Sequence, residues 1–184
     1  MAFFAPMLST WYTLNDGTVV SLNDISKFAT FSQHWKNDQR TQLQYEIKDG
    51  DLPHQISNRL YGTVDYWWTV LLFNDIWDFN SQWPRNPGQV DDYIASKYPD
   101  NNPFDAHHYI SPNGLVADLL SMKLQYNVTS DADAIRLGNL EAISIYDYEH
   151  ALNDLKRNII VIDPDSIQSV QREYEDLMAG ISNG

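Results

Sequence analysis

The chain of 184 residues carries 25 acidic and 12 basic side chains, which gives a formal net charge of −13, and it contains no cysteine. This charge would repel a phosphate backbone, so no nucleic acid is expected as a partner. The absence of cysteine excludes disulfide frameworks, thiolate metal sites and cysteine nucleophiles. Aromatic residues make up 13% of the chain, which is ample for packed cores.

Two features argue against a membrane or secreted protein. The longest near-continuous apolar run, residues 66–73, is far shorter than the roughly 18 residues that cross a bilayer. The first residues lack the basic and apolar regions of a secretory signal. We therefore expect no membrane partner and a protein made in the cytoplasm.

The first 44 residues predict an arm followed by a short helix. Residues 1–20 are apolar in patches and contain the turn sequence Asn15-Asp16-Gly17, which indicates an extended arm or a short hairpin. Residues 22–31 then place Ile25, Phe28 and Ala29 at helical spacing, which predicts a short amphipathic helix.

A compact strand-helix-helix module follows. Residues 45–48 alternate apolar and polar side chains before a tight turn at Gly50, so a short strand is expected. Asp51 can cap the next helix, Pro53 suits its first turn, and Gly62 would end it. The apolar stripe of this helix is Leu52, Ile56 and Leu60.

The second predicted helix, residues 65–74, is apolar on nearly every face and must be covered from two sides. The aromatic residues around it are denser than one small helix pair could bury. They are Tyr61, Tyr66, Trp67, Trp68, Phe73, Trp77, Phe79 and Trp83. Either residues 77–99 fold back over these rings, or some rings meet a partner or a glycan.

The second half of the chain predicts further short elements. A helix is expected at 89–97 between proline-rich breakers, and Asn113-Gly114 is a strong signal for a β-hairpin. Residues 140–155 have helical periodicity, and the β-branched run 158–162 predicts a strand. A last helix should open after Asp163-Pro164-Asp165 and end near Gly180.

No residue pattern indicates catalysis, a cofactor or a metal. The histidines are scattered, and the adjacent pair His107-His108 would point to opposite faces of a strand. A glycosidase needs two carboxylates across a cleft, but no spacing selects a pair among the glutamates. These are Glu46, Glu141, Glu149, Glu173 and Glu175. No nucleophile elbow, P-loop or dinucleotide-binding turn occurs.

The run 45–75, YEIKDGDLPHQISNRLYGTVDYWWTVLLFND, resembles a LysM module, with a strand ending in a K-x-G-D turn and two helices, the second ending in Asn. Its apolar second helix departs from glycan-binding LysM domains. It is similar instead to the LysM-like baseplate wedge subunits of contractile-tailed bacteriophages, the family of the T-even-type wedge protein 53. The shared residues include Leu60-Tyr61-Gly62, Tyr66-Trp67 and Asn74-Asp75.

The resemblance implies an α+β fold with a LysM-like βαα(β) core, an N-terminal arm and helix, a β-hairpin insertion and a C-terminal helix-strand-helix. It divides the chain into four consecutive segments. These are the arm and helix (1–44), the LysM-like module with a wrapped connector (45–100), the hairpin region (101–138) and the C-terminal elements (139–184).

The resemblance also implies a structural, non-catalytic virion protein of the tail baseplate. It would link neighbouring wedges of a sixfold baseplate and contact wedge-core and sheath-initiating subunits. Two rival readings are a LysM-type module that binds peptidoglycan or chitin and a tail-associated hydrolase. The candidate partner-interface or glycan-groove residues are Gly50, Asp51, Leu52, Tyr61, Trp67, Trp68, Asn74, Asp75 and Trp77.

Overall fold

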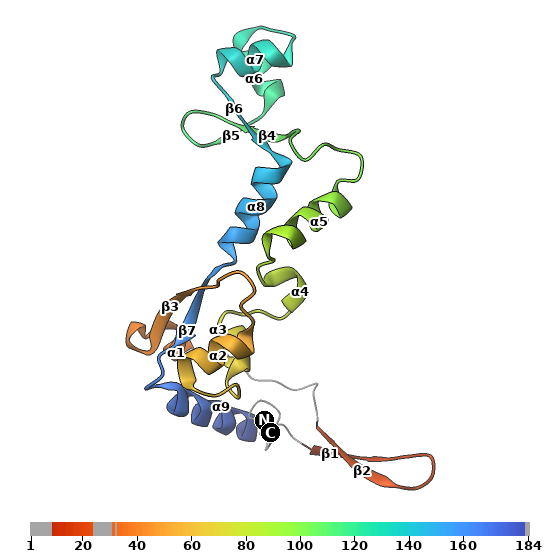
Figure 1. Cartoon of the computed structure of the whole chain (residues 1–184), viewed down its shortest axis with the longest axis vertical. Coiled ribbons are helices and arrows are strands. Elements are labelled where there is room, and N and C mark those ends of the chain that lie inside the picture. The colour runs from red at the N-terminus through yellow and green to blue at the C-terminus, as the bar shows by residue number, and fades with distance from the viewer. Residues whose placement is uncertain (1–8, 24–30, 32, 183–184) are drawn as a thin grey trace. The chain divides into compact units, whose positions relative to one another are not determined.

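The computed structural model describes residues 9–23, 31 and 33–182 and has the predicted α+β class (Figure 1). Its contacts group the chain into two compact units. Unit 1 comprises residues 1–83 and 157–184, and unit 2 comprises residues 84–156. The last strand and helix therefore return to the first unit. The proposed division into four consecutive segments stays a prediction.

Unit 1 begins with an antiparallel hairpin of β1 (Ser9–Thr13) and β2 (Val19–Asn23). Gly17 at its turn has a φ of +83°, a conformation that favours glycine. Of the two predicted forms for this segment, the structure shows the hairpin. The helix predicted over 22–31 begins within β2, and residues 24–30 lie outside the described part.

The main body of unit 1 follows from Gln33 onward. Its elements are α1 (Gln33–Asn37), a 3₁₀ turn (Gln39–Thr41), β3 (Gln42–Glu46), α2 (Pro53–Tyr61), α3 (Trp67–Phe73), α4 (Phe79–Gln82), β7 (Asn158–Ile162) and α9 (Ile167–Ser182). β3 and β7 form an antiparallel two-stranded sheet that joins segments more than 100 residues apart. The strand predicted at 158–162 is confirmed.

Helix α2 begins and ends close to its predicted bounds, but its N-terminal cap differs from the prediction. Gly62, with a φ of +73°, caps its C-terminus. The N-cap is Leu52, whose backbone N–H donates to Oε1 of Gln55 at 3.0 Å. Asp51 does not cap the helix, because its carboxylate is engaged by Tyr45 and Arg59 instead.

Helix α3 is covered on two sides, as its all-round apolar sequence predicts. Trp68 and Leu72 belong to a core cluster with α9 residues such as Tyr174. Val70 belongs to a second cluster that includes Ile56 of α2. The two clusters lie on different faces of the same short helix, which explains why its sequence lacks a polar stripe.

Unit 2 contains two short helical pairs and a three-stranded antiparallel sheet in the order β5-β4-β6. Its elements are α5 (Pro87–Lys97), β4 (Ala106–Ile110), β5 (Val116–Ala117), α6 (Leu119–Tyr126), α7 (Asp131–Leu137), β6 (Glu141–Ser144) and α8 (Ile145–Leu155). The hairpin predicted at Asn113-Gly114 is confirmed as β4-β5, and Gly114 has a φ of +80°.

The core of unit 2 is small. Val90 and Ile94 of α5 pack against Ile145 of α8. Around this cluster, Glu149 and Asn153 of α8 are each 5% exposed and make polar contacts. The amide of Asn153 accepts from the Arg85 N–H at 2.7 Å and donates to the Arg85 carbonyl at 2.9 Å.

Candidate partner-binding surface

The loop after β3 is held in place by Asp51, one of the predicted surface residues. Asp51 is 7% exposed, and its carboxylate accepts hydrogen bonds from Oη of Tyr45 at 2.8 Å and Nη2 of Arg59 at 2.9 Å. The hydrogen bond from Arg59 lowers the pKa of Asp51, although burial acts in the opposite direction. Asp51 therefore has a structural role that joins β3, the loop and α2.

Asn74 has a comparable structural role at the end of α3. Its Nδ2 donates to the carbonyls of Val70 at 2.8 Å and Ile160 at 2.7 Å, and its Oδ1 accepts from the Ile160 N–H at 2.9 Å. The side chain thus substitutes for a neighbouring strand beside β7. Asp75, with a φ of +54°, is exposed and pairs with Lys36 at 2.6 Å.

The predicted aromatic residues divide between core and surface. Trp68 is 1% exposed and Tyr61 is half-buried, donating to the Ile162 carbonyl at 2.9 Å. Burial raises the pKa of Tyr61 to about 12. In contrast, Trp67 is 36% exposed and Trp77 is 56% exposed. Some rings of the aromatic cluster are therefore buried and others exposed, and contact of the exposed rings with a partner or glycan stays a prediction.

The segment that follows α3 contributes one buried ring and one partly exposed ring. Trp83 folds back into the core, where its Nε1 donates to the Asp51 carbonyl at 3.1 Å. Phe79 stacks on Trp83 at 5.3 Å between ring centroids but stays 38% exposed. The connector covers one side of the module and leaves aromatic surface on another.

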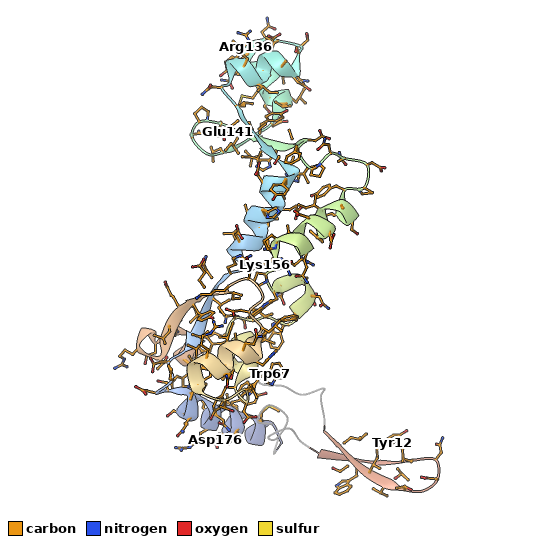
Figure 2. The ribbon with its side chains drawn as sticks, in the orientation of Figure 1. Tyr12, Trp67, Arg136, Glu141, Lys156 and Asp176 are labelled. Atoms are coloured by element: carbon orange, nitrogen blue, oxygen red, sulfur yellow. The ribbon has the colours of Figure 1, made fainter. Side chains whose placement is uncertain are left out.

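An apolar groove of about 340 Å³ lies on this surface of unit 1. It is lined by Leu52, Pro53, His54, Trp67, Leu71 and Phe79. The side chain of Trp67 is labelled in Figure 2. Two of these residues, Leu52 and Trp67, are among the predicted ones. Phe79 also lines the groove but was not among the predicted site residues; its place in the aromatic cluster is the one sequence signal that indicates it.

A second, polar groove of about 740 Å³ lies beside the Gly50 turn. It is lined by Asp49, Gly50, Asp51, His54, Gln55, Asn58, Arg59 and Val64. Neither of these two grooves is lined by Asn74 or Asp75. The candidate residues Gly50 and Asp51 therefore line the polar groove and Asn74 and Asp75 do not; most of its hydrogen-bonding groups come from the exposed face of α2.

Two other parts of the chain expose large apolar side chains. On the hairpin, Trp11 is 74% exposed and Tyr12 is 56% exposed; the latter is labelled in Figure 2. In unit 2, the segment 115–124 exposes four apolar residues by more than 60% each. They are Leu115, Val116, Leu120 and Leu124. Such surfaces are typical of protein interaction sites.

Three of the polar residues considered for chemistry, His107, His108 and Glu149, lie in unit 2. A β-bulge at His107 brings Nδ1 of His107 within 2.9 Å of Nδ1 of His108, so the prediction that these rings point apart is wrong. Although burial acts to raise it, hydrogen bonds from Lys97 and Tyr98 hold the pKa of Glu149 below its ordinary range.

Within 9–23, 31 and 33–182, no three histidine, aspartate or glutamate side chains cluster as metal ligands would. None of the described helices combines the length and apolar character that a bilayer crossing requires.

The chain is thus a small α+β protein with several exposed apolar surfaces. In a protein-family comparison, the family described as base plate wedge protein 53 matches residues 1–116, which is more than half of the chain. The chain therefore belongs to this family of phage baseplate wedge proteins. The comparison with curated proteins gave no match.

Family membership confirms the predicted baseplate wedge resemblance and gives a coarse function. The chain is a structural component of the phage tail baseplate and associates with other baseplate proteins in the virion. The likeness to LysM modules stays a prediction, as does the glycan-binding role of the residues around Gly50.

Proposed function

We propose that this chain links neighbouring wedges by binding different baseplate proteins through separate surfaces. The observation that supports the proposal is the distribution of exposed apolar side chains over three parts of the chain. These are the hairpin β1-β2, the apolar groove of unit 1 and the segment 115–124 of unit 2. A protein with one partner would need only one such surface, whereas a linker needs at least two.

The proposed partners are wedge-core and sheath-initiating subunits of a sixfold baseplate. The link would be non-catalytic and need no cofactor. Aromatic rings such as Trp67 and Trp11 would act as anchors, because a half-exposed ring can bury much area with little loss of side-chain freedom.

The experiment uses wedges assembled without this chain, to which the full chain or a variant is added. Trp67→Ser with Phe79→Ser alters the apolar groove, and Leu120→Ser with Leu124→Ser alters the segment 115–124. We expect each double variant to bind single wedges but not to join them, as judged by sedimentation and electron microscopy.

Leu155→Ser is the matched control, because Leu155 is 72% exposed and lies outside all three surfaces. It should join wedges as the unaltered chain does. If the unaltered chain binds wedges without joining them, or if both double variants join wedges normally, the linking proposal is wrong.

The alternative function, binding of peptidoglycan or chitin, is favoured by one observation, the polar groove beside Gly50. Asp51 and Asn74 are poor positions for its test, since both side chains make structural hydrogen bonds and a loss of binding could not be assigned to lost glycan contacts. His54→Ala with Asn58→Ala changes two exposed side chains of α2 that line this groove and keeps the capping contact of Gln55. Retention of the full chain on insoluble peptidoglycan or chitin, and its loss in this double variant, would support glycan binding.

A further inference from the structure

The two outer edges of the β3-β7 sheet differ in how their backbone groups are satisfied. The Ile47 N–H donates to the Arg157 carbonyl at 2.8 Å, and the Asp163 N–H donates to the Thr41 carbonyl at 2.9 Å. In the antiparallel register, these bonds determine which residues direct their backbone N–H and carbonyl groups toward the partner strand. Odd-numbered residues of β3 bond to β7, and even-numbered residues point their backbone groups outward.

The outer edge of β7 is closed by side chains of the helical module. Asn74 bonds to both the N–H and the carbonyl of Ile160, at 2.9 and 2.7 Å, and Oη of Tyr61 donates to the Ile162 carbonyl at 2.9 Å. These are outward-facing groups by the same alternation. No strand could be added beside β7 without displacing them.

The outer edge of β3 is open. Gln42, Gln44 and Glu46 direct their backbone N–H and carbonyl groups away from β7, and no described residue bonds to these groups. Figure 1 shows β3 as the outer strand, with β7 on the side of α3. An edge with unpaired donors and acceptors is a template for another strand.

The side chain of Leu43 on β3 is also incompletely covered. Leu43 is paired with Val161, which is 1% exposed, yet Leu43 itself is 40% exposed. It lies at the rim of the face that the helices cover. A further strand would place a side chain next to Leu43 and complete this face.

We propose that the outer edge of β3 binds an extended segment of another baseplate wedge protein by strand addition. The segment would place an apolar residue beside Leu43 and neutral or basic residues beside Gln44 and Glu46. Acidic residues are disfavoured by the exposed Glu46 and by the net charge of −13. This inference rests on the proposed function, since it describes how one linking surface engages its partner.

Amide hydrogen exchange on the full chain, alone and bound to wedges, tests whether the outward backbone N–H groups of β3 become bonded in the complex. In the isolated chain, the amides of Gln42, Gln44 and Glu46 should exchange quickly, whereas those of Leu43 and Tyr45 should be protected by β7. Binding to wedges should protect the first three. If they exchange equally fast in the bound chain, strand addition is wrong.

Proline at position 44 tests the same edge by mutation. Gln44→Pro removes an outward N–H and blocks the edge without removing a bond to β7. We expect wedge binding to weaken roughly tenfold or more, with the melting temperature of unit 1 near that of the unaltered chain. Gln44→Ala is the matched control, because it removes the side chain, keeps the N–H and should bind normally.

The outcomes separate this inference from the linking proposal. If the unaltered chain joins wedges and Gln44→Pro does so equally well, strand addition is overturned and the linking function stands. If the isolated chain forms a dimer in which the Gln44 amide is protected, the occupant is a second copy, which also overturns the proposal. Failure of the unaltered chain to join wedges overturns the linking function itself.

Discussion

The two units of this protein are stabilised in different ways. Unit 1 has two apolar clusters on opposite faces of α3, with fully buried residues such as Trp68, Ile56 and Tyr174. Unit 2 has one small cluster around Ile94 and relies more on buried polar contacts of Glu149 and Asn153. Hydrophobic burial should therefore dominate the stability of the first unit, and specific hydrogen bonds should matter more in the second.

The composition of the chain makes the two units separable by experiment. All six tryptophans lie within residues 1–83, so tryptophan fluorescence follows unit 1. Unit 2 contains none and can be followed by amide hydrogen exchange.

The largest effect is expected for Trp68→Ala in the core of unit 1. Trp68 packs against Tyr174 at 4.6 Å and Phe31 at 5.8 Å between ring centroids, so its removal leaves a large cavity. The free energy of unfolding should fall by about 3–5 kcal/mol. Urea unfolding followed by tryptophan fluorescence measures the change.

Trp67→Ala is the matched control one residue away. Because Trp67 is 36% exposed, its replacement should lower the free energy of unfolding by less than Trp68→Ala does. Equal destabilisation by both substitutions would contradict the division of the rings between core and surface.

A smaller effect is expected for Glu149→Gln in unit 2. The Glu149 carboxylate is 2.7 Å from Nζ of Lys97 and 2.8 Å from Oη of Tyr98, and its own side chain is 4% exposed. The neutral amide would leave Lys97 without its counter-ion, although Lys97 keeps access to water. We expect a loss of about 1–3 kcal/mol, measured as faster exchange of α5 and α8 amides.

The tryptophan fluorescence of unit 1 is the internal reference for Glu149→Gln, and its urea midpoint should stay unchanged. If the urea midpoint shifts and the exchange of the α5 amides does not change, Glu149 stabilises unit 1 and not unit 2. Such a result would remove the contrast between apolar and polar stabilisation.

The smallest effect concerns the pH dependence of unit 1. The folded-state pKa of Asp51 lies below its ordinary value of 3.8, so the stability that Asp51 contributes is present above that pH. It is lost as the pH falls from about 3.8 through the lowered pKa. Because Arg59 is half exposed, the contribution should be less than about 1 kcal/mol.

Asp51→Asn should therefore lower the stability of unit 1 slightly at neutral pH and flatten its decline as the pH falls from about 3.8 through the lowered pKa of Asp51. The measurement is urea unfolding across this range by tryptophan fluorescence. A variant that keeps the full decline would show that other carboxylates control the acid sensitivity.

The sequence by itself determined most of the local elements. Pro53 and Gly62 mark the ends of α2, Asn113-Gly114 marks the β4-β5 turn, and the run 158–162 is the strand β7. These signals are local because proline, glycine and β-branched residues restrict their own backbone. The family resemblance was likewise carried by a contiguous run, residues 45–75.

Only the tertiary structure decided which of these elements meet and which residues stay exposed. The pairing of β3 with β7 joins residues more than 100 positions apart, and the hydrophobic periodicity of the sequence does not predict it. The roles of Asn74 and Asp51 as structural hydrogen-bonding residues, and the opposite fates of Trp67 and Trp68, follow from that pairing and from packing on two faces of α3. A side chain's type limits what it can do, but its neighbours in space determine whether it is buried, bonded or free to bind a partner.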